Sequence, residues 1–312
     1  MVRANAAFYA GPDPLAHFTT APEISQAFGE CLGLWAAVTW QQMGSPDPAW
    51  LVELGPGRGT LMADAHRAIS AMVPDFARAA RIALVESSPS LRARQRATGL
   101  PVTWFDNVLD LPPGPAIVLA NEFFDALPIR QFIRRGGVWM ERWVTDGRFA
   151  EQLATLDLPE DADGTVMEIG EAAGALAAAI GARLAAQGGA ALILDYGPAA
   201  SGPGDTLQAI RNHAATDPLA APGSADLTAH VDFAALARAA APAVAHGPLP
   251  MGLFLQRLGL VSRAAMLARS APAQAGLILS GAQRLVAAEG MGSLFKALCL
   301  GQHGAPVPPG FE

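Results

Sequence analysis

Cysteine and charge are both scarce in this sequence. Its 312 residues include two cysteines, and charged residues make up only 16%. Cys31 and Cys299 lie far apart and form no CxxC pair, so we expect reduced, buried thiols in a cytosolic protein rather than disulfides. The six histidines are scattered without the spacing of metal ligands, and we therefore predict no metal site.

Lysine is almost absent as well. Lys296 is the only lysine, so arginine carries nearly all the positive charge, and the formal net charge is −7. The sequence has no run of basic residues, and no nucleic-acid partner is expected. The abundance of alanine, glycine and arginine suggests a bacterial gene rich in G and C.

Long hydrophobic runs are also missing. The alanine-rich stretches near 172–182 and 239–249 are too short, and too poor in leucine and isoleucine, to span a bilayer. The N-terminus has no apolar segment followed by a cleavage site. Because 51% of the residues are hydrophobic, we predict a globular, soluble protein of the bacterial cytoplasm without membrane insertion.

Strand and helix patterns alternate from about residue 49. Short buried strands are expected at 49–55, 81–87, 102–105, 115–122 and 190–197, and helices at 60–72 and 89–97. This alternation predicts an α/β fold with a doubly wound parallel sheet and right-handed crossovers. The apolar face of the helix at 60–72 is expected to consist of Leu61, Ala65, Ala68, Ile69 and Met72.

Four regions are expected along the chain. An N-terminal segment (1–48) precedes a Rossmann-like core (49–230), a helical insertion or substrate subdomain (231–290), and a closing edge strand with a tail (291–312). Within the core, RQFIRRGGVWMERWVT (130–145) predicts a β-hairpin around a Gly-Gly turn. Residues 198–230 have many turn formers and are expected to form a long functional loop.

The segment VELGPGRGT carries Gly55, Gly57 and Gly59 between a strand and a helix. Glycine leaves room for a ligand beside the backbone, and the free N–H groups of the helix that begins near Thr60 favour a negative group. Two ligand classes compete for such a turn. A dinucleotide fold has GxGxxG spacing, whereas the third glycine here comes one step early. The alternative is S-adenosylmethionine, which tolerates the carboxylate of Glu53 because its methionine part carries no phosphate.

Four further polar residues follow predicted strands or loops. Glu86 closes the second strand, where a carboxylate can bind both hydroxyls of a ribose, with a solvated strand end as the alternative. Asp106 and Asn107 follow the third strand, where methyltransferases often bind adenine, although the pair is also ordinary turn chemistry. His230, in DLTAHVDF, is a candidate general base or else a partner for a loop carbonyl.

The segment NEFFDALP follows the fourth strand. It places Asn121, Glu122 and Asp125 beside Phe123 and Phe124 at the carboxyl edge of the sheet, where ligands bind in doubly wound folds. Paired carboxylates suit a guanidinium nucleophile because they bind it in fork geometry, and methyl transfer requires the nucleophile to be held in line. A helix N-cap with a hydrophobic staple is the alternative, above all for Asp125.

Together these motifs resemble the MidA-like methyltransferases, a family that includes a mitochondrial complex I assembly factor. The resemblance extends over nearly the whole chain and rests on FTTAPEISQAFGE (18–30), VELGPGRGTLM (52–62), LVESSPSLRARQ (84–95), ANEFFDALP (120–128), LILDYG (192–197), GDTLQAIRNHAATDPLAAPGSADLTAHVDF (204–233) and MGSLFKAL (291–298). It implies a class I methyltransferase Rossmann-like fold with a mostly helical insertion. It also implies that S-adenosylmethionine is the cofactor and S-adenosylhomocysteine the product.

The resemblance further implies roles for particular residues. The methionine end of the cofactor would be held by Glu53, Gly55, Gly57, Gly59 and Thr60, its ribose by Glu86, and its adenine side by Asp106 and Asn107. Thr19, Thr20, Pro22 and Glu23 would cover the cofactor. Catalytic roles would fall to Asn121, Glu122, Asp125 and His230, with Glu122 and Asp125 facing an incoming arginine. Phe124, Asp195 and Tyr196 would line the substrate side.

The activity implied by the resemblance is protein-arginine N-methylation, on a 49-kDa-type subunit of complex I (NADH dehydrogenase) during its assembly. Two alternatives stay open: a non-catalytic assembly or scaffold protein that binds S-adenosylmethionine, and a small-molecule methyltransferase. An oligomer is possible. Members of the family usually carry a further helical segment before the position matching Phe8, so a reduced cover over the cofactor is expected.

Overall fold

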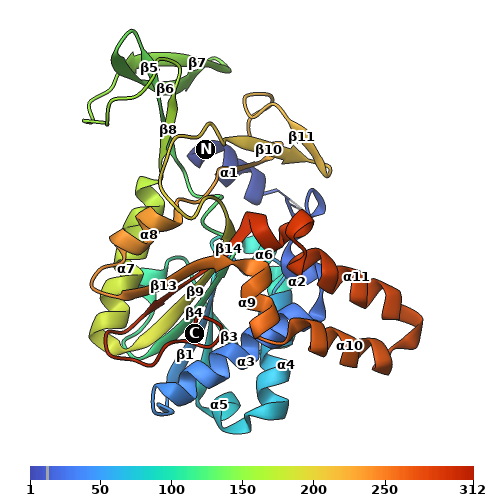
Figure 1. The fold of residues 1–312 in the computed structure, drawn as a ribbon. Helices are drawn as coiled ribbons and strands as arrows, with labels where there is room; N and C mark the ends of the chain where they lie inside the picture. Colours follow the sequence, from blue (N-terminus) through green and yellow to red (C-terminus); the bar gives the residue numbers. More distant parts are fainter. Residues whose placement is uncertain (12–13) are drawn as a thin grey trace.

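A computed structural model describes residues 1–11 and 14–312. Its centre is a seven-stranded sheet with the strand order β13-β14-β9-β4-β1-β2-β3 (Figure 1). Strands β3, β2, β1, β4 and β9 run parallel, whereas β14 is antiparallel to both of its neighbours. The prediction of a doubly wound, mostly parallel sheet is confirmed.

The strands of this central sheet are β1 (Ala49–Leu54), β2 (Ala80–Val85), β3 (Val102–Phe105), β4 (Ala116–Asn121), β9 (Gly189–Tyr196), β13 (Val244–Pro250) and β14 (Phe295–Gly301). The helices are α1 (Val2–Tyr9), α2 (Ala21–Ile24), α3 (Gln26–Gln42), α4 (Thr60–Met72), α5 (Pro74–Ala79), α6 (Pro89–Arg96), α7 (Glu171–Gln187), α8 (Phe233–Ala239), α9 (Met251–Arg257), α10 (Leu260–Ser270) and α11 (Ala275–Val286). Short 3-10 or π turns occupy Pro14–Ala16, Val108–Asp110, Pro272–Gln274 and Ala288–Gly292.

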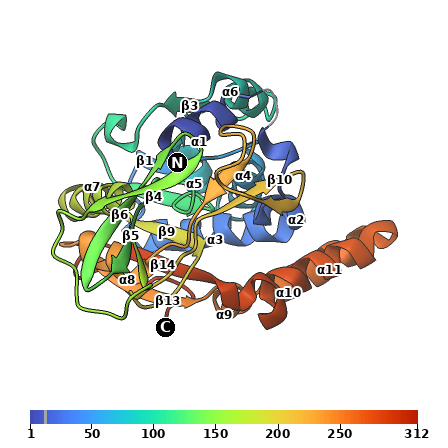
Figure 2. The ribbon, with the colours of Figure 1, turned by 90° about the horizontal axis from the view of Figure 1, so that it is seen from above.

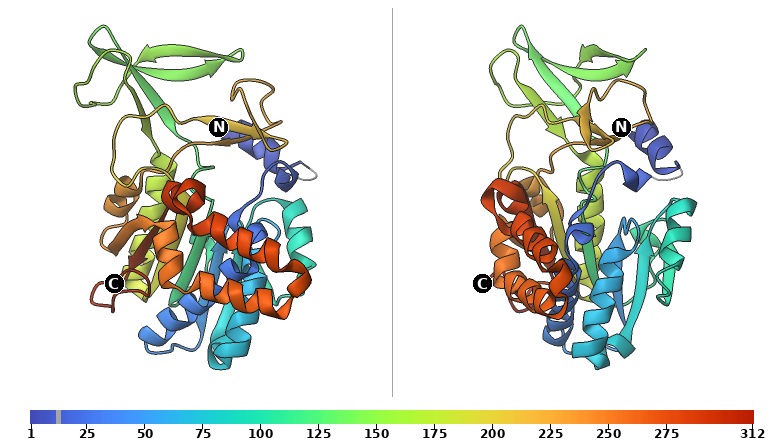
Figure 3. Two further views of the ribbon diagram at one scale, coloured as in Figure 1. Left: turned by 45° about the vertical axis from the view of Figure 1, so that its right-hand side comes forward. Right: turned by 90° about the vertical axis from the view of Figure 1, so that its right-hand side faces the viewer.

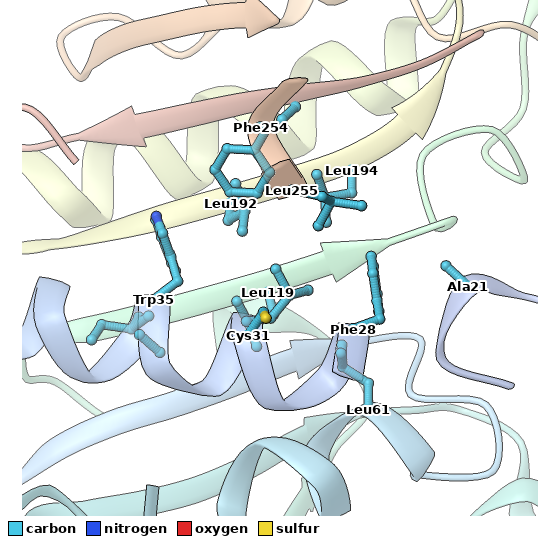
Figure 4. Packing of buried hydrophobic residues seen from close by; sticks show 14 of the residues in the cluster. Ala21, Phe28, Cys31, Trp35, Leu61, Leu119, Leu192, Leu194, Phe254 and Leu255 are labelled. Atoms are coloured by element: carbon cyan, nitrogen blue, oxygen red, sulfur yellow. The ribbon is translucent and has the colours of Figure 1, made fainter. Parts of the chain in front are cut away.

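Alternate residues of the central strands enter two separate hydrophobic layers, as the period-2 geometry of a strand requires. On one face, α3, α4 and α9 pack against Leu119 of β4 and Leu192 and Leu194 of β9 (Figure 4). The buried rings of Phe28, Trp35 and Phe254 fill this layer. On the other face, α7 and α8 cover the residues that point the opposite way. The sheet is therefore buried on both faces, and a ligand can reach it at the carboxyl ends of its parallel strands.

A second, four-stranded antiparallel sheet stands away from the core in Figures 1 and 3, with the order β7-β6-β5-β8. Its strands are β5 (Arg130–Arg135), β6 (Val138–Thr145), β7 (Arg148–Leu153) and β8 (Val166–Ile169). The predicted hairpin is confirmed as β5 and β6, with Arg135 paired to Val138 across Gly136 and Gly137. The outer strand β7 leaves this sheet with an uncovered edge.

The predicted long loop contains a small three-stranded sheet. Its strands are β10 (Gln208–Arg211), β11 (Ala214–Thr216) and β12 (Asp226–Thr228), and α1 packs beside them (Figure 3). Asn5 connects the two segments, because its side chain bonds both backbone groups of Leu227. Helices α10 and α11 form a hairpin that extends away from the body of the molecule (Figure 2).

Three expectations differ from the structure. Residues 244–250 form the edge strand β13, although the pattern predicted helix there. Strand β14 is consequently not an edge strand, since it lies between β9 and β13. Met72 is 69% exposed and is not part of the buried face of α4. Within the described residues, no helix is both long and apolar enough to cross a membrane.

Candidate functional site

A cavity of about 490 Å³ lies beyond the carboxyl ends of β1, β2 and β4. Four predicted segments form it: the glycine turn after β1, the acid at the end of β2, the segment after β4, and the N-terminal segment around Thr20 to Glu23. Helix α1 adds wall residues that were not predicted. The wall of the cavity comprises Asn5, Ala6, Tyr9, Ala10, Leu15, Phe18, Thr20, Pro22, Glu23, Glu53, Gly55, Pro56, Gly57, Arg58, Thr60, Leu61, Val85, Glu86, Ser87, Ser88, Pro89, Leu91, Asp106, Asn121, Glu122, Phe123, Ala126 and Leu127.

The glycine turn gives this cavity its floor. Gly55 and Gly57 have φ values of 60° and 54°, in the left-handed region that other residues rarely adopt. A β-carbon on Gly55 would lie 2.6 Å from the Phe123 ring, whereas one on Gly57 would meet only Leu15, at 3.4 Å. Gly57 therefore faces open cavity. Gly59 is not part of the wall; it is the N-cap of α4 and packs toward Thr98.

Glu53 is a buried carboxylate in the cavity wall, with 4% of its surface exposed. Its Oε2 has no hydrogen-bond partner among the described residues. Burial raises the pKa of Glu53 to about 8, against an ordinary value of 4.5, and a hydrogen bond from the backbone of Met62 lowers it only in part. An unpaired buried acceptor of this kind suits a cationic group of a ligand.

Because the folded pKa of Glu53 is raised, the protein with an empty cavity should lose stability as pH rises. The native state keeps a proton on Glu53 that the unfolded state releases. The stabilisation that this proton provides is therefore complete below pH 4.5 and is lost as the pH rises through 8. Between pH 5 and pH 8.5 the Tm of the wild type should fall, and the Tm of Glu53→Gln should fall by about 2–4 °C less. Differential scanning calorimetry measures both. The exposed Glu160→Gln should behave as wild type, and an equal fall for Glu53→Gln would contradict the assignment.

Glu86 lies at the next strand end, where the ribose site was predicted. Its Oε1 accepts a hydrogen bond from Ser88 N at 2.8 Å, and Gln95 Nε2 lies 3.4 Å from Oε2. Burial raises its pKa. Asp106 also reaches the cavity wall, but it is exposed and pairs with Arg92 at 2.7 Å. Asn107 is not part of the wall. Its side chain accepts a hydrogen bond from Leu109 N and caps a 3-10 turn.

The N-terminal segment covers the cavity. Thr20, Pro22 and Glu23 lie in the wall as predicted, and Glu23 Oε1 accepts a hydrogen bond from Thr60 Oγ1 at 2.6 Å. Thr19 is exposed and outside the wall. This cover continues into α1, which also lines the cavity.

Helix α1 contributes wall residues that sequence reasoning missed. Asn5 Nδ2 donates to Ala126 O and Leu227 O, and the Tyr9 hydroxyl donates to Asp226 Oδ1 at 2.8 Å. Ser88 Oγ donates to Tyr9 O on the opposite side of the cavity. No motif marks these residues; the scarcity of tyrosine, two in the whole chain, is the only signal that could have drawn attention to Tyr9.

Asn121 ends β4, Glu122 follows it, and both enter the cavity wall as predicted. Glu122 Oε1 accepts hydrogen bonds from Ala21 N at 2.7 Å and from Asn121 Nδ2 at 3.1 Å. Burial nevertheless raises the pKa of Glu122 to about 7. Glu122 also has a φ of 50°, which is uncommon for a residue with a side chain and indicates local strain.

Asp195 stabilises this strained turn from below. Its Oδ2 accepts hydrogen bonds from the backbone N–H groups of Phe123, Phe124 and Asp125, at 3.1, 2.9 and 3.2 Å. Asp195 is fully buried, so it does not line the substrate side as expected. Phe124 is likewise buried in the core beneath the turn, and Phe123 lies in the cavity wall in its place.

Replacing Asp195 by asparagine should destabilise the protein by about 2–4 kcal/mol, because an amide NH₂ would oppose a backbone N–H in either orientation. Urea unfolding monitored by circular dichroism measures this change. Asp157→Asn, in an exposed loop, should stay within about 0.5 kcal/mol of wild type. A similarly small effect for Asp195→Asn would show that the turn does not depend on this carboxylate.

Asp125 belongs to a buried cluster of acids behind the turn, together with Asp195 and Asp226. Burial first, and then the neighbouring carboxylates, raise the pKa of Asp125 well above its usual range, and burial raises that of Asp226 to about 6. The Tyr196 hydroxyl donates to Thr228 Oγ1 at 2.5 Å beside this cluster. Asp125 and Tyr196 are therefore near the cavity but are not part of its wall.

His230 lies in a second cavity of about 580 Å³, beyond the carboxyl end of β9. Glu168, Thr206, Asp232 and Lys296 also line this cavity. The His230 ring packs edge-on against Tyr196, with 5.4 Å between ring centroids. Burial lowers the pKa of His230. The ring of Tyr196 thus lies between His230 and the acid cluster.

The sheet order, with one antiparallel strand inserted near its end, and a glycine-floored cavity at its carboxyl edge define a class I methyltransferase. The chain belongs to the family described as "Putative S-adenosyl-L-methionine-dependent methyltransferase", whose model matches residues 31–249. Its activity class is therefore methyl transfer from S-adenosylmethionine, and the predicted fold, cofactor and family are confirmed.

Relatives and solved structures agree with this membership. The chain is 35% identical to protein arginine methyltransferase NDUFAF7 of Danio rerio, over 89% of this chain and 75% of that protein. It is 33% identical to the human protein of the same name, over 92% and 74%. A crystal structure from Burkholderia thailandensis bound to S-adenosyl-homocysteine has a TM-score of 0.81 at 28% identity, covering 95% of this chain and 81% of that chain.

The cavity wall fits S-adenosylmethionine on chemical grounds. The unpaired Oε2 of Glu53 can accept hydrogen bonds from an ammonium group, and the open space beside Gly57 leaves room for the chain that carries it. Glu86 offers carboxylate oxygens to hydroxyl groups. The volume of about 490 Å³ is within the usual range for sites of small cofactors.

Proposed function

We propose that this protein is an S-adenosylmethionine-dependent protein-arginine N-methyltransferase. The observation that carries the proposal is Glu122, a half-buried carboxylate in the cavity wall with its pKa raised to about 7. The names of the relatives support a protein arginine as the acceptor. A cationic guanidinium beside Glu122 would favour the ionised carboxylate and be held by charge-assisted hydrogen bonds.

The cofactor-binding roles are part of this proposal. Glu53, Gly55, Gly57 and Thr60 would hold the methionine end, Glu86 the ribose, and Asp106 the adenine side. Thr20, Pro22 and Glu23 would cover the bound cofactor. Gly59 would act through the start of α4, and Asn107 through the turn that it caps.

When bound, S-adenosylmethionine supplies an electrophilic methyl group on a sulfonium. Glu122 would hold the guanidinium so that one nitrogen lies in line with the methyl carbon, and would take up the proton that this nitrogen releases. Asn121 and the backbone N–H of Ala21 fix the Glu122 carboxylate. Asp125 would act behind it, from within the buried acid cluster.

The second cavity would receive the part of the acceptor that surrounds the arginine. It lies at the carboxyl end of β9 and the amino end of the antiparallel β14, on the far side of Glu122 from the glycine turn. His230, in this second cavity, is the alternative candidate for the general base, because burial favours its neutral form. Tyr196 would shape the passage between the two cavities.

We further propose that the acceptor is the 49-kDa-type subunit of complex I, methylated in the cytoplasm during assembly, as the family resemblance implies. Incubation of the purified protein with this subunit and methyl-labelled S-adenosylmethionine tests both the arginine methylation and the choice of acceptor. Acid hydrolysis and mass spectrometry should detect labelled methylarginine. Cofactor binding without label in any protein would instead support a scaffold role, and label only in small molecules would support a small-molecule methyltransferase.

A further inference from the structure

One face of the β5–β8 sheet carries an uncovered apolar patch on β6 and β7. Opposite residues of an antiparallel pair point to the same side, and Val144 pairs with Phe149 while Met140 pairs with Leu153. Val138 lies on the same face, two residues before Met140 on the strand. Four of these side chains are exposed, by 46% for Val138, 54% for Val144, 42% for Phe149 and 68% for Leu153.

The opposite face of the same strands is covered only in part, since Trp143 on that face is 50% exposed. Trp139 is only 6% exposed, and its Nε1 donates to Pro159 O at 2.9 Å. Ala154 N donates to Trp139 O. The patch is thus a cluster of exposed apolar side chains on the outer two strands of the sheet, and exposed apolar clusters often mark an interaction surface.

Arg142 and Glu151 lie opposite each other within the patch, between its two apolar pairs, and the charged residues on this face have ionic partners. Arg135 pairs with Glu151 at 3.0 Å, and Arg142 Nη1 donates to Asp205 Oδ2 at 3.1 Å. The Arg142 guanidinium also lies 5.2 Å from the centre of the Phe149 ring. The patch is consequently close to neutral, and it suits an apolar protein surface rather than a charged one.

The patch shares its face with the acceptor side of the molecule. Gln131 pairs with Arg142 on β6 and with Glu168 on β8, so all three side chains lie on the same face as the patch. Glu168 also lines the second cavity. At the usual strand spacing, β8 and β7 are separated by about 14 Å across the sheet.

The sheet is also continuous with the first cavity. Leu127 lies in that cavity wall, and β5 begins three residues later, at Arg130. A free amino acid or small molecule in the cavity would not reach the patch, whereas a folded protein presenting an arginine to the cavity would extend over it. The patch is thus linked to the first cavity through the chain from Leu127 to β5, and to the second cavity through the sheet face that carries Glu168.

We propose that Val138, Met140, Val144, Phe149 and Leu153 form the docking surface for the folded acceptor protein. This inference rests on the proposed arginine methyltransferase function. Docking here would raise the local concentration of the target arginine at Glu122 without adding a contact to the guanidinium.

The test compares the wild type with the double variant Phe149→Ser, Leu153→Ser. The substrates are the folded 49-kDa-type subunit and an arginine-containing peptide digest of the same subunit made with a glutamate-specific protease. We expect kcat/KM on the folded subunit to fall at least tenfold in the variant, mainly through KM. Activity on the peptides and the affinity for S-adenosylhomocysteine should change less than twofold.

A matched control removes two exposed leucines outside the walls of both cavities, Leu277→Ser with Leu279→Ser on α11, and should match the wild type on both substrates. Equal loss on the folded subunit and on peptides, or no loss on either, would overturn the docking surface while leaving the methyltransferase function intact. Dissociation of a wild-type dimer by the patch variant in light scattering would also overturn it, by assigning the patch to a second copy. If the wild type methylates neither substrate, the proposed acceptor is wrong, and the docking surface falls with it.

Discussion

Glu122→Gln should lower kcat for methyl transfer by about 10²–10³-fold, because the neutral amide can neither pair with a guanidinium nor accept its proton. The side chain would keep its hydrogen bond from Ala21 N, so the turn should be preserved. The affinity for S-adenosylhomocysteine, measured by calorimetry, should change less than about threefold. Glu160→Gln, with the same change of charge on an exposed loop, should have wild-type activity.

The pH profile separates this role from a merely structural one. Glu122 must be ionised to hold the guanidinium, and its pKa in the free protein is about 7. Wild-type kcat/KM should therefore fall as pH decreases below 7, whereas Glu122→Gln should lose this dependence along with its activity. An acidic limb that is unchanged in the variant, or a near-normal kcat, would exclude Glu122 as the acceptor-binding carboxylate.

Gly57→Val should abolish measurable binding of S-adenosylmethionine, a loss of at least 100-fold in affinity. The valine methyl groups would occupy the open space that Gly57 leaves in the cavity floor. Valine is also strained at a φ of 54°, which by itself could perturb the turn. The measurement is calorimetric titration of wild type and variant with S-adenosylmethionine.

Gly99→Val is the matched control for that strain. Gly99 has a φ of 73° and open space around its Cα, but it is not part of the cavity wall. Its replacement should lower Tm by an amount similar to that for Gly57→Val and leave cofactor affinity within about twofold of wild type. Retained binding in Gly57→Val would show that the methionine end of the cofactor lies elsewhere.

The sequence predicted the parallel part of the sheet well, because its strands are buried on both faces and appear as short apolar runs. It failed at β13, whose segment VAHGPLP contains two prolines and a glycine. An edge strand tolerates proline because one row of its N–H groups is unpaired, and this strand also has an irregular register between His246 and Leu249. Local pattern alone could not reveal such a strand.

The site was predictable where motif and strand end coincide, as for Glu53, Glu86 and Glu122. It was not predictable where backbone geometry decides which side chain faces the cavity. The left-handed φ of Glu122 reverses the expected alternation, so Phe123 enters the wall and Phe124 enters the core. Asp195 was expected beside the substrate, and only the fold shows that its carboxylate accepts hydrogen bonds from backbone N–H groups instead.

The bond between Asn5 and Leu227 has a consequence for synthesis of the chain. The two residues are 222 positions apart, so α1 is synthesised long before β12 and must wait for it before it can take its place over the cavity. A nascent chain with β1, β2 and β4 already folded would have the floor of the site without its roof. Tight retention of the cofactor is therefore expected only after β12 has been made, and fragments that end before β12 should bind it weakly and release it quickly.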